Sequence, residues 1–244
     1  MSDTGGENYI RWKHWDFEKF AKVDPGASYY FDQLFKKYRV LRNRNNILEI
    51  GFGNGELLGY LRKLDHKVTG VEINSHLVER AIKYGFNAFK GAIWDIPELQ
   101  LEKFDLIMAF DVAEHMTHLE LNELFFWVKN HLNKGGKLIL RFPEGASPLG
   151  LAYQNGDFTH VTSLTKWKIL ALCDKNNLEL LTYSDEFLRS NKLCAFGFPG
   201  RMVLRMLQGY ASMVRWTMRI LLYPLSIDLR LGTNSIAVIA AVEI

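Results

Sequence analysis

The residue types best suited to chemistry form a short glycine-rich stretch flanked by two acids. An apolar run leads directly into Gly51, Gly53 and Gly55. Glycine lets the backbone turn sharply and lets a ligand approach without a Cβ in the way. Glu49 lies two residues before the first glycine, and Glu72 closes the next apolar run. A carboxylate at this second position can accept hydrogen bonds from both hydroxyls of a ribose.

The spacing of this loop favours a cationic ligand over a pyrophosphate. A dinucleotide fingerprint has the form G-x-G-x-x-G, whereas this chain has G-x-G-x-G with Leu58, not glycine or alanine, beyond it. The Glu49 carboxylate would repel a pyrophosphate and attract the sulfonium and ammonium groups of S-adenosylmethionine (SAM). We therefore expect SAM as the cofactor and S-adenosylhomocysteine as its product. An NAD-dependent dehydrogenase is a distant alternative.

Strand-like and helix-like stretches alternate around this loop and must hold it in place. Such alternation indicates right-handed βαβ units on a parallel sheet. The expected strands are residues 46–50, 67–73, 88–90, 105–110, 137–142, 178–183 and 235–244. The expected helices are residues 29–41, three that begin at 55, 75 and 118, and 164–176.

Residues 46–142 resemble the core of the class I SAM-dependent methyltransferases. The family's motifs are matched in order by LEIGFGNG (48–55), VTGVEIN (68–74), GAIWDIP (91–97), FDLIMAFDVAEHM (104–116) and LNKGGKLILRFP (132–143). The resemblance implies an α/β, Rossmann-like fold: a mostly parallel sheet of seven strands, the last antiparallel. We expect a single methyltransferase domain over residues 1–244. Its expected parts are an N-terminal helical cap (1–45), a cofactor-binding core (46–197), an amphipathic helical insertion (198–232) and the last strand (233–244).

The resemblance also implies a role for each part of the cofactor site. The loop glycines would pack on the methionine part, Glu72 would hold the ribose, and Asp95 would hold the adenine amino group. Trp94 or Ile96 would lie against the adenine ring. Core packing is the alternative for Trp94, and a helix or turn cap is the alternative for Asp95. The full expected cofactor site is Glu49, Gly51, Phe52, Gly53, Asn54, Gly55, Glu72, Ile73, Trp94, Asp95, Ile96, Phe110 and Asp111.

The stretch after residue 110 carries the candidates for catalysis. It reads Asp111-Val-Ala-Glu-His and lacks the prolines of an Asn/Asp-Pro-Pro-aromatic motif, which argues against methylation of nucleic-acid bases. Its D-x-x-E-H pattern resembles a subgroup that acts on quinones, sugars and other small or lipid-borne acceptors. His115 is the first candidate for a base or acceptor-orienting group, because a neutral imidazole can accept a proton near neutral pH. A histidine that bonds loop backbone is the alternative. His160 is the second candidate, and Glu114 either orients His115 or starts the next helix.

Cysteine and histidine patterns exclude other classes of site. The seven histidines include no H-E-x-x-H and the chain has no C-x-x-C, so we expect no metal site. Two cysteines in 244 residues indicate a reducing compartment without a disulfide framework. We expect no secretory signal, and the sequence contains no apolar run of about 18 residues. We expect a cytoplasmic protein, with peripheral contact at the inner face of the membrane as a further possibility.

Residues 198–230 do not fit the alternation and carry the net basic charge. Five arginines and one aspartate give this segment a charge of +4, against +3 for the whole chain. On a helix the polar residues would form one narrow stripe: Arg201, Arg205, Gln208, Ser212, Arg215 and Arg219. Three interpretations are open: a membrane-interface helix with arginines at anionic headgroups, a dimer interface or lid, and a buried core helix. Gly209 could divide the segment into two helices.

These features predict a SAM-dependent enzyme that methylates oxygen on a small-molecule or lipid-linked acceptor. A sugar of a surface glycan or a quinone-type ring would fit. Two alternatives remain: an N- or C-methyltransferase of a soluble metabolite, and a catalytically silent methyltransferase fold that acts as a binding module. No nucleic-acid partner is expected, since the basic residues between 36 and 44 are more typical of a solvated helix face. Peripheral membrane contact or a homodimer through residues 198–230 is expected.

Overall fold

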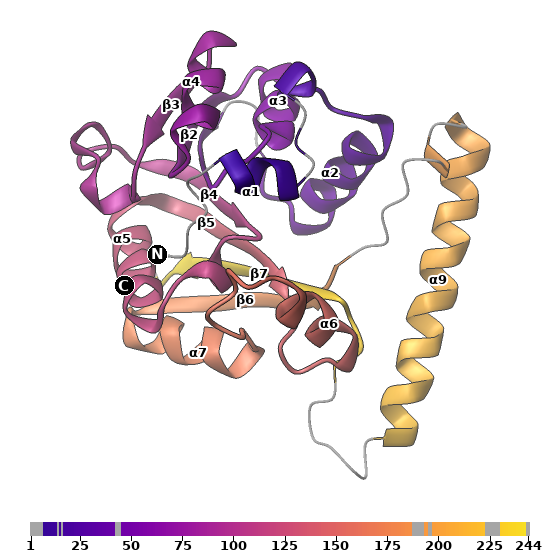
Figure 1. Cartoon of the computed structure of the whole chain (residues 1–244). Coiled ribbons are helices and arrows are strands. Elements are labelled where there is room, and N and C mark those ends of the chain that lie inside the picture. The colour runs from indigo at the N-terminus through magenta and orange to yellow at the C-terminus, as the bar shows by residue number, and fades with distance from the viewer. Residues whose placement is uncertain are drawn as a thin grey trace.

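One seven-stranded sheet organises the molecule, a computed structural model that describes residues 7–13, 15, 17–41, 45–186, 193–194, 197–222 and 230–242 (Figure 1). The strands lie in the order β3-β2-β1-β4-β5-β7-β6. Their bounds are β1 (Asn46–Ile50), β2 (Lys67–Glu72), β3 (Asn87–Lys90), β4 (Phe104–Phe110), β5 (Leu132–Pro143), β6 (Leu178–Asp185) and β7 (Asn234–Ala241).

The sheet is parallel from β3 to β5, and β7 runs antiparallel between β5 and β6. This confirms the predicted Rossmann-like α/β fold with an antiparallel last strand. Strand β5 begins five residues before the predicted 137, because Leu132 already pairs with Phe104 before a register shift. The last two residues of the predicted final strand, 243 and 244, lie outside the described residues.

Helices on both faces bury the central strands, which is why those strands are apolar at nearly every position. The helices that alternate with the strands are α3 (Glu56–Lys63), α4 (Ser75–Lys83), α5 (His118–His131) and α7 (Lys166–Lys175). Leu48 and Ile107 point into the cluster that contains Phe125 of α5. Their neighbours Ile47 and Leu106 point to the opposite face. Neighbouring residues thus serve opposite cores, as the two-residue period of a strand requires.

The N-terminal segment forms α1 (Glu7–Trp12), a 3-10 turn η1 (Phe17–Lys19) and α2 (Pro25–Tyr38). Asp24 starts α2, since its carboxylate accepts hydrogen bonds from the N–H groups of Gly26 and Ala27 at 2.7 and 2.8 Å. The helix therefore begins four residues before the predicted 29. It ends before the predicted 41 because Arg39 adopts a left-handed conformation, with φ of 48°. Leu34 on its inner face is fully buried against the sheet.

A helix not expected from the sequence, α6 (Pro148–Gly156), follows β5. Ser147 caps it by accepting hydrogen bonds from the N–H groups of Leu149 and Gly150, and Pro148 occupies its first turn. Glycines at positions 150 and 156 obscure a helical pattern in this stretch.

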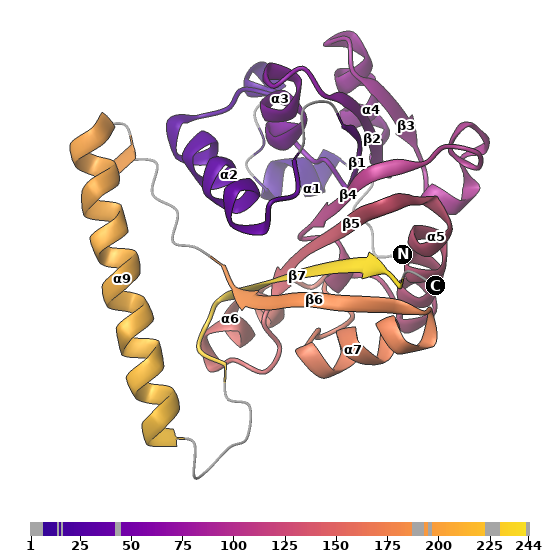
Figure 2. The ribbon, with the colours of Figure 1, turned by 180° about the vertical axis from the view of Figure 1, so that it is seen from behind.

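Helix α9 (Gly197–Leu222) is a single helix of 26 residues that continues through Gly209, so the suggested division there is wrong. It lies beyond the carboxyl ends of β5 and β6, as both views show (Figures 1 and 2). Leu204 is buried with Tyr29 and Cys194. Large apolar side chains elsewhere on the helix are exposed, which rules out the core-helix interpretation: Phe198, Met202, Val203, Met206, Leu207, Tyr210, Met213, Val214, Trp216, Met218, Ile220 and Leu221. None of the described helices is both long and apolar enough to cross a membrane.

Candidate active site

A cavity of about 730 Å³ opens where β1, β2 and β4 end. Each strand places one acidic or aromatic residue in its wall: Glu49, Glu72 and Phe110. Trp15 and Asp24 of the N-terminal segment also line the cavity. The carboxyl ends of the strands and the N-terminal helices thus enclose one space, which is where open α/β sheets bind ligands.

The glycine loop between β1 and α3 is forced into shape by its surroundings. Gly51 has φ of +68°, and a Cβ there would lie 2.3 Å from Cγ2 of Val112. Gly53 has φ of +51°, and a Cβ there would lie 2.9 Å from the Trp15 ring. Any other residue would therefore be both strained and obstructed at these positions. At Gly53 the space is taken by the N-terminal segment, which packs directly on the loop.

Glu72 is fixed by backbone donors at the end of β2. Its carboxylate accepts hydrogen bonds from the N–H groups of Gly53, Ile73 and Asn74 at 3.1, 2.8 and 3.1 Å. Burial raises the pKa of Glu72, and these N–H groups act in the opposite direction. The carboxylate is thus held rigidly at the cavity wall, as expected of a group that binds a ribose.

Glu49 contributes a buried carboxylate with an unsatisfied oxygen to the cavity wall. Its side chain is buried in the cavity wall, and its Oε2 has no hydrogen-bond partner among the described residues. Burial first, and then the charges of Glu72 and Glu56, raise its pKa well above the usual range. An ammonium group in the cavity would satisfy this oxygen and neutralise the charge. The residues present therefore fit SAM, whose amino-acid part carries that group.

Most of the predicted cofactor residues surround this one cavity. The lining includes Glu49, Gly51, Phe52, Gly53, Asn54, Glu72, Ile73, Trp94, Phe110 and Asp111. Three do not line it: Gly55 ends the loop in contact with Phe20, Asp95 is exposed, and Ile96 is buried in the core. An adenine contact by Asp95 stays a prediction.

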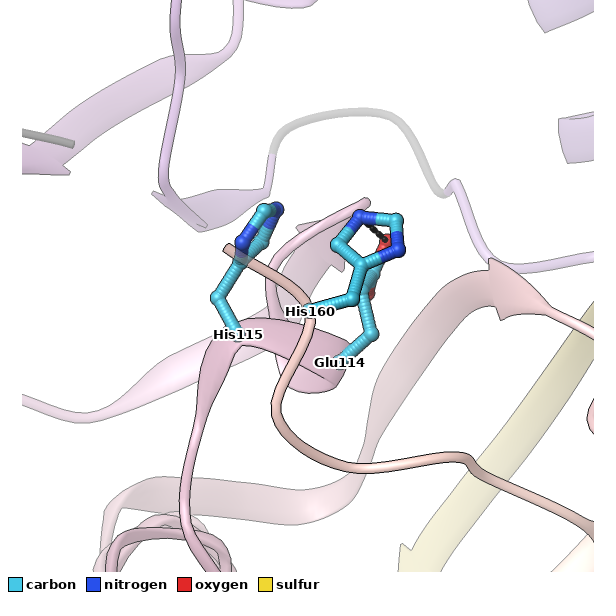
Figure 3. Close-up of side chains that lie close together, drawn as sticks. All are labelled: Glu114, His115 and His160. Carbon is cyan, nitrogen blue, oxygen red and sulfur yellow. Dashed lines mark ion pairs between the residues drawn. The ribbon is translucent and has the colours of Figure 1, made fainter. Parts of the chain in front are cut away.

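Two segments far apart in the sequence bring the predicted histidines together. The 3-10 turn η4 (Ala113–His115) follows β4, and its Glu114 carbonyl accepts hydrogen bonds from the N–H groups of Val161 and Thr162. The Thr162 hydroxyl also donates to the Met116 carbonyl at 2.7 Å. The rings of His115 and His160 consequently lie with centroids 4.6 Å apart, beside the Glu114 carboxylate (Figure 3).

Both histidines are oriented by backbone carbonyls. Nδ1 of His115 lies 3.1 Å from the Thr159 carbonyl, and Nδ1 of His160 lies 3.2 Å from the Gln154 carbonyl. An N–H at each Nδ1 satisfies these contacts and leaves the Nε2 lone pair free to accept. Burial and the neighbouring His160 lower the pKa of His115 to about 4, so its ring is neutral at neutral pH. His115 lines the cavity, and His160 is not among its lining residues.

Several lining residues were not predicted from the sequence, among them Lys13, Trp15 and Arg141. Arg141, near the end of β5, forms ion pairs with Asp111 and Glu186. Lys13 pairs with Asp157 at 3.2 Å. These are contacts between segments distant in the chain, which no local spacing reveals.

Comparisons with known proteins agree with this geometry. The model of a methyltransferase domain family matches residues 23–183. An uncharacterized methyltransferase of Bacillus pumilus is 25% identical over 143 residues, which span 55% of this chain and 66% of that protein.

Solved structures share the fold. A SAM-dependent methyltransferase from Archaeoglobus fulgidus has a TM-score of 0.59 and 19% identity, with 95% of this chain and 98% of that chain covered. A possible histamine N-methyltransferase from Thermotoga maritima has a TM-score of 0.57 and 18% identity, with 96% and 94% covered.

Proposed function

We propose that this chain methylates a hydroxyl oxygen of a small or lipid-linked acceptor near a membrane surface. The chain belongs to the methyltransferase domain family and is a SAM-dependent methyltransferase. A sugar of a surface glycan or a quinone-type ring has the required chemistry. SAM supplies a methyl group activated on a sulfonium. The observation that carries the choice of oxygen is the neutral, backbone-oriented His115 in the cavity wall.

A hydroxyl needs help that an unprotonated amine does not, because it must lose its proton as its oxygen is methylated. His115 is placed to accept or hold that proton, since Nδ1 is tied to the Thr159 carbonyl and the ring borders the cavity. The rest of the rate would come from alignment and exclusion of water, which the N-terminal segment supports by closing over the glycine loop.

Helix α9 supports a membrane-proximal acceptor, although not through the contact first expected. Two arginines of its polar stripe face the protein: Arg205 Nε donates to the Tyr29 hydroxyl at 3.0 Å, and Arg215 Nε lies 3.4 Å from Asp185. The outward face is consequently apolar, with Trp216 65% and Met206 67% exposed. A helix whose arginines contact the protein leaves its apolar side chains facing away from it, where they can contact a bilayer. Aromatic and aliphatic side chains of this kind enter the acyl boundary of a bilayer.

The catalytic part is tested with acceptors of known chemistry. Purified enzyme is assayed with saturating SAM against hydroxyl, amine and carbon acceptors of sugar and quinone type. We expect O-methylated product, and a loss of turnover above about tenfold in His115→Ala. His118→Ala, an exposed histidine three residues along, is the control. A smaller loss in His115→Ala would remove it as the base, and product methylated on nitrogen or carbon would favour the alternative enzyme class.

The silent-fold alternative makes a separate prediction. A protein that only binds partners would show no thermal shift with SAM. A SAM-dependent shift together with turnover excludes that alternative.

The membrane part is tested by co-sedimentation with phosphatidylglycerol/phosphatidylcholine vesicles. We expect Leu207→Glu/Trp216→Glu to stay in the supernatant while the wild-type protein sediments. Leu119→Glu, at an exposed leucine of α5, is the matched control. Equal recovery of wild type in the supernatant with and without vesicles would contradict membrane contact. A concentration-dependent dimer abolished by the double substitution would instead identify α9 as an interface between copies.

A further inference from the structure

We propose that Glu114, His115 and His160 form a binding site for a divalent first-row transition-metal ion at the wall of the active-site cavity. One side-chain ligand atom from each residue lies within 4.8 Å of the other two (Figure 3). Two imidazoles and one carboxylate are a ligand set that proteins use for zinc, iron and manganese with open positions left for substrate. The expectation of no metal site rests on the absence of local sequence motifs, and these ligands lie on two separate segments that form no such motif.

The Glu114 carboxylate is the strongest indication of a cation site. The side chain is 1% exposed, and neither of its oxygens has a hydrogen-bond partner among the described residues. A buried carboxylate without donors is costly unless a positive charge or a proton compensates it. Among those residues the basic group within 4 Å is His160, whose Nε2 lies 3.8 Å from Oε1, and the charges of Arg141 and Lys13 act on the carboxylate from farther away.

The orientation of both histidines suits metal ligands better than hydrogen-bond donors to the Glu114 carboxylate. Each has Nδ1 near a backbone carbonyl, Thr159 for His115 and Gln154 for His160. Histidines that bind metals are generally oriented in this way, with one ring N–H donated to a carbonyl and the other nitrogen on the metal. The cluster therefore brings together two imidazoles and a carboxylate, with one ligand atom of each within 4.8 Å of the others.

The geometry is close to that of a bound site. Ligand bonds of about 2.0–2.2 Å place neighbouring ligand atoms roughly 3.0–3.5 Å apart. With 3.8 Å between Glu114 and His160, and up to 4.8 Å across the whole cluster, the side chains must approach one another by roughly 1 to 2 Å at most to bind an ion. Asp157, with Oδ2 3.5 Å from Nε2 of His160, adds negative charge beside the site and is itself paired with Lys13.

The catalytic consequence rests on the proposed function, whereas the site itself does not. Of the three ligands His115 lines the cavity, so an ion held by the cluster would lie at the cavity wall, where it could bind an acceptor. An acceptor hydroxyl bound there loses its proton to solvent more readily. Its oxygen then forms the bond to the methyl carbon, while the carbon–sulfur bond breaks with both electrons on sulfur. In this arrangement His115 acts through the metal instead of taking the proton itself.

The site is tested with metal ions alone on the intact chain. Protein is stripped with EDTA, dialysed, and titrated separately with Co²⁺, Zn²⁺ and Mn²⁺ by calorimetry, with the visible spectrum of bound Co²⁺ as a second signal. We expect a single equivalent bound. We expect His160→Ala and Glu114→Gln each to weaken binding by about 100-fold or more and to abolish the Co²⁺ spectrum. His118→Ala should bind as the wild type does.

SAM-dependent thermal shifts and circular dichroism are recorded on every variant, so that loss of fold is recognised. If Glu114→Gln does not fold, His160→Ala decides. A folded wild-type protein that binds SAM but no metal would overturn the site and leave the proposed function standing, because a proton would then neutralise the cluster. Metal binding that survives both substitutions would also overturn it. Methyl transfer unchanged after EDTA treatment would overturn the catalytic consequence.

Discussion

The surroundings of the Glu49 side chain favour the binding of a cationic ligand. Its carboxylate is buried at the end of β1, close to the charges of Glu72 and Glu56, and its pKa is raised well above the usual range. Without a cation in the cavity the protonated form is therefore more favoured than in an exposed glutamate. With the ammonium of SAM beside it the ionised form is favoured instead, so cofactor binding and proton release are coupled.

The coupling predicts a pH-dependent affinity for SAM. As the pH falls through the raised pKa of Glu49, the carboxylate becomes protonated and affinity decreases; as the pH rises, affinity increases. Glu49→Gln should bind roughly 10- to 100-fold more weakly at high pH, the value of a charge-assisted hydrogen bond, and should lose this pH dependence.

Calorimetry in two buffers of different ionisation enthalpy measures the proton released. Glu79→Gln, an exposed acid on α4, is the control. Heats that do not depend on the buffer would show that Glu49 is already ionised in the free protein.

Two glycines with similar φ values allow the cost of a left-handed backbone to be distinguished from the cost of a steric clash at Cβ. Gly51 has φ of +68° and no room for a Cβ, whereas Gly85 has φ of +77° and no atom within 4 Å of the position that a Cβ would take. Gly85→Ala should cost about 1 kcal/mol, from the left-handed conformation alone. Gly51→Ala should cost about 2 kcal/mol or more and should weaken SAM binding, since Val112 must move. Urea denaturation of both variants checks this, and equal losses would show that the loop relaxes without cost.

Residue identities in the glycine loop were predictable because the motif is local. Glu49, the glycines and Glu72 follow from spacing along two strands and the turn between them. Arg141 and Lys13 could not be predicted, since each reaches the cavity from a segment remote from the loop. The Glu114, His115 and His160 cluster also depends on the hydrogen bonds that tie residues 157–162 to η4.

Among the helices, α2 connects stability to the cavity. Asp24 caps it and also lines the cavity, so one residue serves both purposes. Asp24→Ala should lower stability by about 1 kcal/mol, or roughly 2–4 °C in Tm, and should also weaken SAM binding.

The matched control is Thr165→Ala, which removes the N-cap of α7 outside the cavity lining. It should lower Tm similarly without changing SAM affinity. Thermal melts with and without SAM compare the two variants. Equal SAM affinity in both would show that the start of α2 does not shape the cofactor site.

Elements with a strong period were predicted well, and elements set by distant contacts were not. Strand β1 lies at the predicted residues, because a short, largely apolar run that leads into glycines favours a buried strand over a helix. Helix α6 was missed since its glycines mask the pattern, although Ser147-Pro148 is a capping signal. The continuity of α9 through Gly209 could not be predicted, because a single glycine costs only about 1 kcal/mol in a helix.

For the molecule as a whole, α9 lies between β6 and β7 in the chain and takes no part in the sheet. Of its described side chains only Leu204 is buried among large apolar residues. Replacement of residues 197–222 by a short Gly-Ser linker should therefore leave SAM binding and Tm nearly unchanged while it abolishes vesicle binding. Differential scanning fluorimetry measures Tm, and co-sedimentation measures vesicle binding. A collapse of Tm would show that α9 supports the fold.

The place of β7 in the sheet also sets an order of events during synthesis. Strand β7 lies between β5 and β6, yet it follows α9 in the chain. Until the ribosome has released residues 234–241, β5 has an open edge and β6 has no neighbour. Unpaired edges of this kind invite association with other chains. Helix α9 is therefore displayed before the sheet can close, and any surface that captures it early would hold the nascent chain while its fold is completed.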